Sequence, residues 1–137
     1  MIFFTDRDLG KRFPELLAGA GLQVEQHADH FAASCPDDEW LATVGNRGWV
    51  VVTHDGRIRY KPNELAAVIR HRVALLVVIG RAPYPQLAAN FIACLPQIVS
   101  FVSNQQRPFI AKIYRPAPAE SMKRKVTHGT IALWYPR

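Results

Sequence analysis

Three aspartates occupy positions from which carboxylates can act together in metal or acid–base chemistry. Asp6 directly follows an apolar run at residues 2–5, and Asp55 closely follows another at 49–53. Asp37 opens a predicted helix after a polar loop. In an open α/β sheet, sites form outside the carboxyl ends of the strands, so these side chains are predicted to share one edge. Converging carboxylates repel one another unless a cation lies among them, which predicts Mg²⁺ or Mn²⁺.

Three further acids lie within reach of the same predicted edge: Asp8, Asp38 and Glu39. Six of the 11 acidic residues of the chain then gather at one place. Each acid also has an ordinary explanation as a helix cap, a partner of a helix dipole or a turn residue. Because all six gather at one edge, a cation-binding acid site is favoured over six independent surface acids.

Four basic residues lie beside these acids and are the candidate RNA-binding residues: Arg7, Arg57, Arg59 and Lys61. Cations next to a cluster of carboxylates would attract a phosphate backbone that the acids alone would repel. The three basic residues that follow Asp55 fit an ordinary solvated loop equally well. The basic run at 123–125 does so too.

Other chemistries have weaker support in the sequence. The segment 27–30 holds two histidines and an aspartate, but they lie too close together to form a zinc site alone. His54 is expected to be a bystander more often than a proton carrier. Cys35 and Cys94 fit no metal-ligand spacing and predict free thiols in a reducing compartment. Neither a glycine-rich phosphate loop nor a dinucleotide fingerprint occurs, which argues against a nucleotide cofactor.

The elements that must position these residues alternate along the chain. Short apolar runs predict strands at 2–5, 22–25, 49–53, 73–79, 109–114 and 129–135. Helical spacing predicts helices between them, the last one over 84–104 with a kink at Pro96. This alternation predicts an α/β fold with a mostly parallel central sheet flanked by helices.

Composition and charge narrow the class of protein. The 137 residues suit one domain, and 49% hydrophobic with 20% charged residues excludes a disordered chain. Residues 1–64 carry 10 acids and seven Lys or Arg, a net charge of −3, whereas residues 65–137 carry one acid and 10 Lys or Arg, a net charge of +9. The basic half suggests a polyanionic partner. Neither a signal peptide nor a membrane span is predicted, so we expect a cytoplasmic protein.

Three stretches together resemble the PIN-domain nucleases: FFTDRDLG, PDDEWL and WVVVTHDGRI. The resemblance covers about residues 2–80 and is closest to the VapC-type toxins of bacterial toxin–antitoxin pairs. It implies a single PIN-like domain over 1–137, with a core at about 2–80 and a C-terminal extension at about 81–137 that adds one or two strands.

The resemblance also implies roles for particular residues. Asp6, Asp37 and Asp55 would be the catalytic and metal-binding acids, and Thr53 would support the site. Many members carry a further acid after the Thr-x-Asp motif, where this chain has Gly-Arg-Ile-Arg. Either one of Asp8, Asp38 and Glu39 replaces that acid, or the site holds metal weakly.

The function implied is a metal-dependent endoribonuclease that hydrolyses RNA phosphodiester bonds as the toxin of a toxin–antitoxin pair. Its partners would be RNA and a cognate antitoxin that blocks the acidic pocket, and a homodimer is left open. The alternative is a non-catalytic PIN-like module that binds nucleic acid or another protein.

Overall fold

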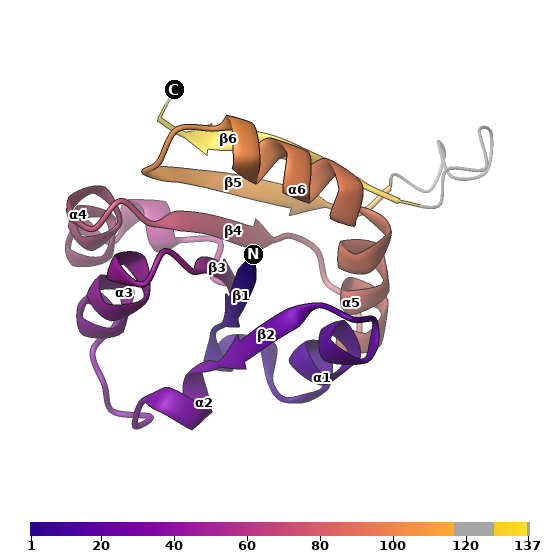
Figure 1. The fold of residues 1–137 in the computed structure, drawn as a ribbon, viewed down its shortest axis with the longest axis horizontal. Coiled ribbons are helices and arrows are strands. Elements are labelled where there is room, and N and C mark those ends of the chain that lie inside the picture. The colour runs from indigo at the N-terminus through magenta and orange to yellow at the C-terminus, as the bar shows by residue number, and fades with distance from the viewer. Residues whose placement is uncertain (117–127, 137) are drawn as a thin grey trace.

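The computed structural model describes residues 1–116 and 128–136, and its central feature is a six-stranded sheet (Figure 1). The strands are β1 (Ile2–Thr5), β2 (Gln23–Gln26), β3 (Val50–Thr53), β4 (Ala74–Val78), β5 (Phe109–Tyr114) and β6 (Thr130–Tyr135). They lie in the order β2-β1-β3-β4-β5-β6, and every neighbouring pair is parallel except β5 with β6. The predicted mostly parallel α/β fold is confirmed, and the C-terminal extension adds two strands. The basic run at 123–125 lies outside the described residues.

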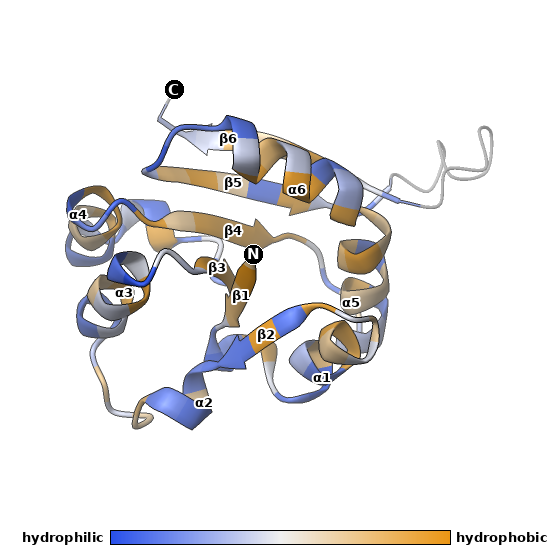
Figure 2. Ribbon diagram, viewed as in Figure 1, coloured by the Kyte–Doolittle hydropathy of each residue, from blue (hydrophilic) through white to orange (hydrophobic). Residues whose placement is uncertain are grey.

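Helices cover both faces of this sheet because alternate residues of each strand point to opposite sides. On one face lie α1 (Arg12–Gly19), α5 (Tyr84–Ala93) and α6 (Leu95–Asn104), and on the other lie α3 (Asp37–Asn46) and α4 (Pro62–Arg70). Shorter pieces are η1 (Arg7–Leu9), α2 (His27–His30) and η2 (Ile58–Tyr60). Every residue of β3 and β4 is buried, as their continuous apolar runs predict. Figure 2 shows the apolar strands at the centre and polar residues on α2.

One helical boundary differs from the sequence prediction. Residues 84–104 form two helices that meet at 64°, where the sequence predicts one kinked helix. Pro96 lies in the first turn of α6, where its missing N–H breaks no hydrogen bond, so it begins a new helix. The first helix begins at Arg12, three residues after η1 ends, because Gly10 adopts a positive φ of 66° between them.

Neither α5 nor α6, nor any other single helix in the described part of the chain, is long and apolar enough to cross a membrane. Taken together, α5 and α6 have the length and apolar composition of a membrane span, but they are bent by 64° where they meet.

The order of the strands determines where a site can form. After β1 the chain adds β2 on one side and then returns to place β3 on the other side of β1. This reversal is a topological switch point, and in open α/β sheets ligands bind there, beyond the carboxyl ends of the strands. The residues after β1 and β3 therefore meet at this point of the edge.

Candidate acidic site

Four aspartates line one open pocket of about 440 Å³ at this edge. Asp6 follows β1, Asp8 lies in η1, and Asp37 is the first residue of α3. Asp55 is the second residue after β3. Three cationic side chains line the same pocket: Arg7, Arg57 and Lys61. The structure thus brings Asp6, Asp37 and Asp55 to one place and adds Asp8 to them.

Thr53 connects two of these acids through its hydroxyl group. Its Oγ1 lies 3.0 Å from Oδ2 of Asp6 and 3.0 Å from Oδ2 of Asp8. The same oxygen of Asp8 also accepts a hydrogen bond of 3.0 Å from the backbone N–H of His54, whose ring Nδ1 lies 2.7 Å from the carbonyl of Val78. One hydroxyl proton serves one carboxylate at a time, so Asp6 and Asp8 compete for the proton of Thr53.

Burial and like charge disfavour ionisation of this pair. Burial first, and then the charge of Asp8, raise the pKa of Asp6 to about 6. Burial also raises the pKa of Asp8, against the lowering effect of its hydrogen bonds with His54 and Thr53. Two ionised carboxylates in such surroundings carry a free-energy cost that a bound cation relieves.

The other two aspartates already have partners. Oδ2 of Asp55 pairs with Nζ of Lys61 at 2.5 Å, and its Oδ1 accepts a hydrogen bond of 3.0 Å from the N–H of Arg57. Burial by itself raises the pKa of Asp55, but Lys61 and Arg57 outweigh burial and lower it below the usual value. Oδ1 of Asp37 accepts a hydrogen bond of 3.0 Å from the indole N–H of Trp40.

The donor set fits a hard divalent cation, because such ions prefer oxygen ligands. Burial is the main cause that raises the pKa of Asp6, and a bound cation would favour its ionised form. Within residues 1–116 and 128–136, no three His, Cys, Asp or Glu side chains already form a metal-binding group. Asp6 and Asp8 would hold a cation first. A third carboxylate would come from Asp55 or Asp37 only after it left its present partner.

Two other predicted acids lie elsewhere. Asp38 lines a separate groove beside α4, together with Asn63 and His71. Glu39 does not line the acidic pocket, although its carboxylate lies 3.8 Å from Sγ of Cys35, which does. Of the three acids proposed as substitutes for the missing ligand, Asp8 is therefore the one that the structure places at the pocket.

The predicted RNA-binding residues also separate. Arg7, Arg57 and Lys61 line the acidic pocket, whereas the guanidinium of Arg59 lies over the ring of Trp134 in β6, 5.6 Å from its centroid. Residues in η2 and directly beside it thus face two different surfaces.

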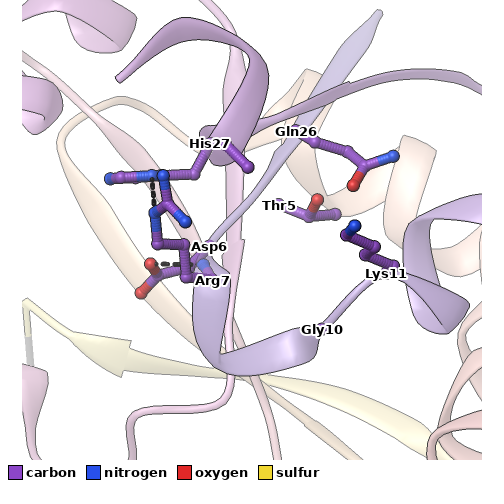
Figure 3. Close-up of a pocket in the computed structure, with 8 residues that line it drawn as sticks. Thr5, Asp6, Arg7, Gly10, Lys11, Gln26 and His27 are labelled. Carbon is purple, nitrogen blue, oxygen red and sulfur yellow. Dashed lines mark hydrogen bonds between the residues drawn. The ribbon is translucent and has the colours of Figure 1, made fainter. Parts of the chain in front are cut away.

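Arg7 and His27 stand between the acidic pocket and a smaller one of about 210 Å³, and both line each pocket. Figure 3 shows the two side chains together beside Asp6. Nε of Arg7 donates to Nδ1 of His27 at 2.8 Å, and its Nη2 donates to the carbonyl of Phe31 at 2.8 Å. Burial and then the charge of Arg7 lower the pKa of His27, whose neutral ring can accept this bond. From sequence alone His27 had only a weak interpretation as a zinc ligand, and no linear signal pointed to its pairing with Arg7.

Comparison with known protein families gives a match to the N-terminal part of the chain. Residues 1–80 match the family model described as a PIN-like domain. No curated protein and no solved structure matches the chain. The matched residues contain every residue of the acidic pocket and end just after β4.

Proposed function

Because this chain belongs to the PIN-like domain family, we propose that it is a metal-dependent ribonuclease that hydrolyses RNA phosphodiester bonds at the acidic pocket. The observation that carries the proposal is the meeting of four aspartates and three cationic side chains around one pocket. The acids suit a divalent cation, and the cations beside them suit a phosphate group. A pocket with both features is what metal-assisted hydrolysis of a polyanion requires.

Asp6 and Asp8 would hold Mg²⁺ or Mn²⁺, with Asp55 or Asp37 as a further ligand. When bound, the ion supplies a water of lowered pKa and shields the charge that develops on the scissile phosphate. Thr53 keeps the facing oxygens of Asp6 and Asp8 in position by sharing its hydroxyl group with both.

The cationic side chains of the pocket would hold the substrate. Arg7 is fixed by its bonds to His27 and Phe31, so it presents its charge with little loss of side-chain entropy on binding. Lys61 can exchange Asp55 for a phosphate oxygen when the carboxylate turns toward a cation.

RNA cleavage by wild type and by Asp6→Asn, each with Mg²⁺, Mn²⁺ or EDTA, tests the proposal. We expect cleavage to require the cation and to fall at least about 100-fold in Asp6→Asn, since a ligand of the ion is removed. Asp38→Asn, which removes an exposed acid outside the pocket, should cleave like wild type. Cleavage that persists in EDTA or in Asp6→Asn would rule the proposal out.

One observation favours a second candidate, a non-catalytic PIN-like module that binds nucleic acid. Asp55 is engaged by Lys61, which leaves the pocket without a third free carboxylate. Such a module would bind RNA with a salt-dependent affinity and would show no metal-stimulated cleavage. The cleavage assay therefore separates the two candidates.

The finer role as a toxin rests on the sequence resemblance to VapC-type proteins. As a toxin, the chain would arrest bacterial growth when produced alone, and an antitoxin that covers the acidic pocket would relieve the arrest. Asp6→Asn should then be harmless at the same expression level.

A further inference from the structure

The two faces of the β5–β6 pair differ in how they are covered. On one face α6 packs Ile98 and Val102 into the core, against which Ile131 and Leu133 of β6 lie. On the other face α3 and α4 pack over β1, β3 and β4, and the side chains that reach Trp134 there come from η2 and β5. Figure 1 shows α6 alongside β5 and β6, whereas α3 and α4 lie apart from it on the left of the view.

Three side chains surround Trp134 and define what we name the η2–β6 surface: Arg59, Tyr60 and Lys112. The guanidinium of Arg59 and Nζ of Lys112 lie 5.6 Å and 3.9 Å from a centroid of the indole ring. The ring of Tyr60 meets the indole edge-on, with centroids 5.7 Å apart. Trp134 itself is 7% exposed, so the outer layer of this surface consists of two cations and a phenol.

Within residues 1–116 and 128–136, the two cations of this surface form no ion pair with an acid. The sequences of η2, β5 and β6 contain no aspartate or glutamate. The ion pairs among the described residues involve Glu25 and Asp55, neither of which belongs to these elements. An indole ring attracts both cations, but it does not neutralise their mutual repulsion. Phosphate groups at Arg59 and Lys112 would neutralise these charges.

Tyr60 adds a second kind of contact beside these cations. Its side chain is 69% exposed, the largest fraction among the exposed large hydrophobic residues of the described chain. An exposed aromatic ring can stack on an unpaired nucleobase of any sequence. Two cations next to a stacking ring suit a nucleotide strand. Its phosphates would lie on Arg59 and Lys112, and an adjoining base would stack on Tyr60.

The acidic pocket and the η2–β6 surface share one short segment of the chain. Arg57 and Lys61 line the pocket, whereas Arg59 and Tyr60 between them turn to Trp134. A single strand whose scissile phosphate lies in the pocket would reach η2 with its adjoining nucleotides. Lys112 and Trp134 lie outside residues 1–80, so this extension of the site is a feature of the C-terminal part of the chain.

We propose that the η2–β6 surface binds single-stranded RNA that extends from the acidic pocket, with phosphate held by Arg59 and Lys112 and a base stacked on Tyr60. This inference rests on the proposed function and adds a binding surface that reaches beyond residues 1–80. A duplex does not satisfy the surface, because paired bases stack on one another and do not offer a face to Tyr60.

Binding is measured in EDTA, without cleavage, by fluorescence anisotropy of a labelled single strand of about 12 nucleotides and of the same strand in a duplex. Tyr60→Ala should weaken single-strand binding at least about fivefold and duplex binding less than about twofold. Tyr60→Phe keeps the ring and should bind like wild type. Circular dichroism of each variant confirms that it is folded.

The double variant Arg59→Ala with Lys112→Ala tests whether these two cations bind phosphate. The slope of log affinity against log salt should fall by about 0.7 for each phosphate of the single strand that the variant no longer neutralises. The matched control is Arg47→Ala, which also removes a guanidinium from over an indole ring, at 4.9 Å from Trp49, and should leave affinity and slope unchanged.

Several results would overturn the inference. They are unchanged single-strand binding in Tyr60→Ala, an equal loss for duplex RNA, tighter binding of single-stranded DNA than of RNA, or equal competition by polyglutamate. The binding and cleavage assays can fail independently. If wild type cleaves RNA and Tyr60→Ala binds normally, the ribonuclease stands and this surface does not. If wild type never cleaves but binding depends on Tyr60, the surface stands and the ribonuclease does not.

Discussion

The surroundings of Asp6 and Asp55 shift the pKa values of these two carboxyl groups in opposite directions. Burial and Asp8 raise the pKa of Asp6 to about 6, whereas Lys61 and Arg57 outweigh burial and lower the pKa of Asp55. Burial is thus the main obstacle to ionisation of Asp6, whereas Asp55 has a cation of its own. An incoming metal ion would gain most from Asp6 and would compete with Lys61 for Asp55.

The raised pKa of Asp6 makes metal-free stability fall as pH rises. Between about pH 4 and 6 the folded state holds a proton on Asp6 that the unfolded state has released, so the free energy of unfolding decreases across this interval. The loss is about 1 to 3 kcal/mol once solvent screening is allowed for. Asp6→Asn should therefore be more stable than wild type at pH 7 in EDTA and equally stable near pH 4, as measured by urea unfolding.

Asp55→Asn provides a control of opposite sign. The pKa of Asp55 is lowered, so its charge stabilises the folded state above the unfolded pKa, and this contribution is lost as pH falls. We expect Asp55→Asn to be less stable than wild type at pH 7. A lower stability of Asp6→Asn at pH 7 would contradict the free-energy cost that we assign to the ionised carboxylate of Asp6.

Lys61 should compete with a metal ion for Asp55. Lys61→Met frees the carboxylate and removes one positive charge from the pocket, and we expect Mn²⁺ to bind roughly tenfold more tightly. Calorimetric titration with Mn²⁺ measures this directly. Lys11→Met, which removes an exposed lysine from the neighbouring pocket, should have a smaller effect. Weaker Mn²⁺ binding by Lys61→Met would mean that the lysine holds Asp55 in the geometry that a cation needs.

At the scale of elements, the sequence predicted the strand ends well. The apolar runs before Asp6 and Asp55 mark β1 and β3, and parallel strands end at the same edge, so the meeting of these acids followed from local pattern. The helix start at Asp37 was equally visible, since Pro36 precedes three acids that suit a helix N-terminus.

The contribution of each remaining acid could not be predicted in the same way. Asp8 reaches the pocket because η1 turns it toward Thr53, whereas Asp38 follows Asp37 on a helix and so points about 100° away from it. Asp8 and Asp38 each lie close in sequence to a pocket residue. Only the local backbone conformation decides which of the two reaches the pocket.

Side-chain contacts between residues that lie far apart in the chain left even less signal in the sequence. Arg59 meets Trp134, which lies 75 residues later in β6, and no local pattern links the two. Tyr84 of α5 donates a hydrogen bond of 2.6 Å from its hydroxyl to the carbonyl of Asp8, and its ring lies 3.2 Å from where a Cβ on Gly10 would stand. A helix outside the matched residues 1–80 thus holds the loop that carries two pocket acids.

On the scale of the whole molecule, the PIN-like part and the C-terminal extension share one core. β4 pairs with β5 along its whole length, and Phe91 of α5 packs edge-on against Phe3 and Phe13, with ring centroids 5.5 and 5.8 Å apart. The acidic half of the chain supplies the pocket, and the basic half supplies part of its apolar support. We therefore predict that residues 1–80 and the extension unfold as a single unit.

Phe91→Ala tests this shared core. Phe91 is fully buried, so truncation removes its apolar packing and leaves a cavity, which should lower the free energy of unfolding by about 3 to 5 kcal/mol in urea. Phe101→Ala, at a half-buried ring of α6 that packs on Phe109, should cost less.

Two probes show whether the unfolding is cooperative. In a Trp134→Phe background, the fluorescence of Trp40 and Trp49 reports on the PIN-like part alone, while far-UV circular dichroism reports on the whole chain. For a single cooperative unit the two transitions coincide, and Phe91→Ala shifts both to lower urea by the same amount. If the circular dichroism signal instead falls in an early step that the fluorescence does not follow, and Phe91→Ala moves only that step, then α5, α6 and the last two strands form a separate folding unit. The support that Tyr84 gives to the acidic pocket would then be lost before the pocket itself unfolds.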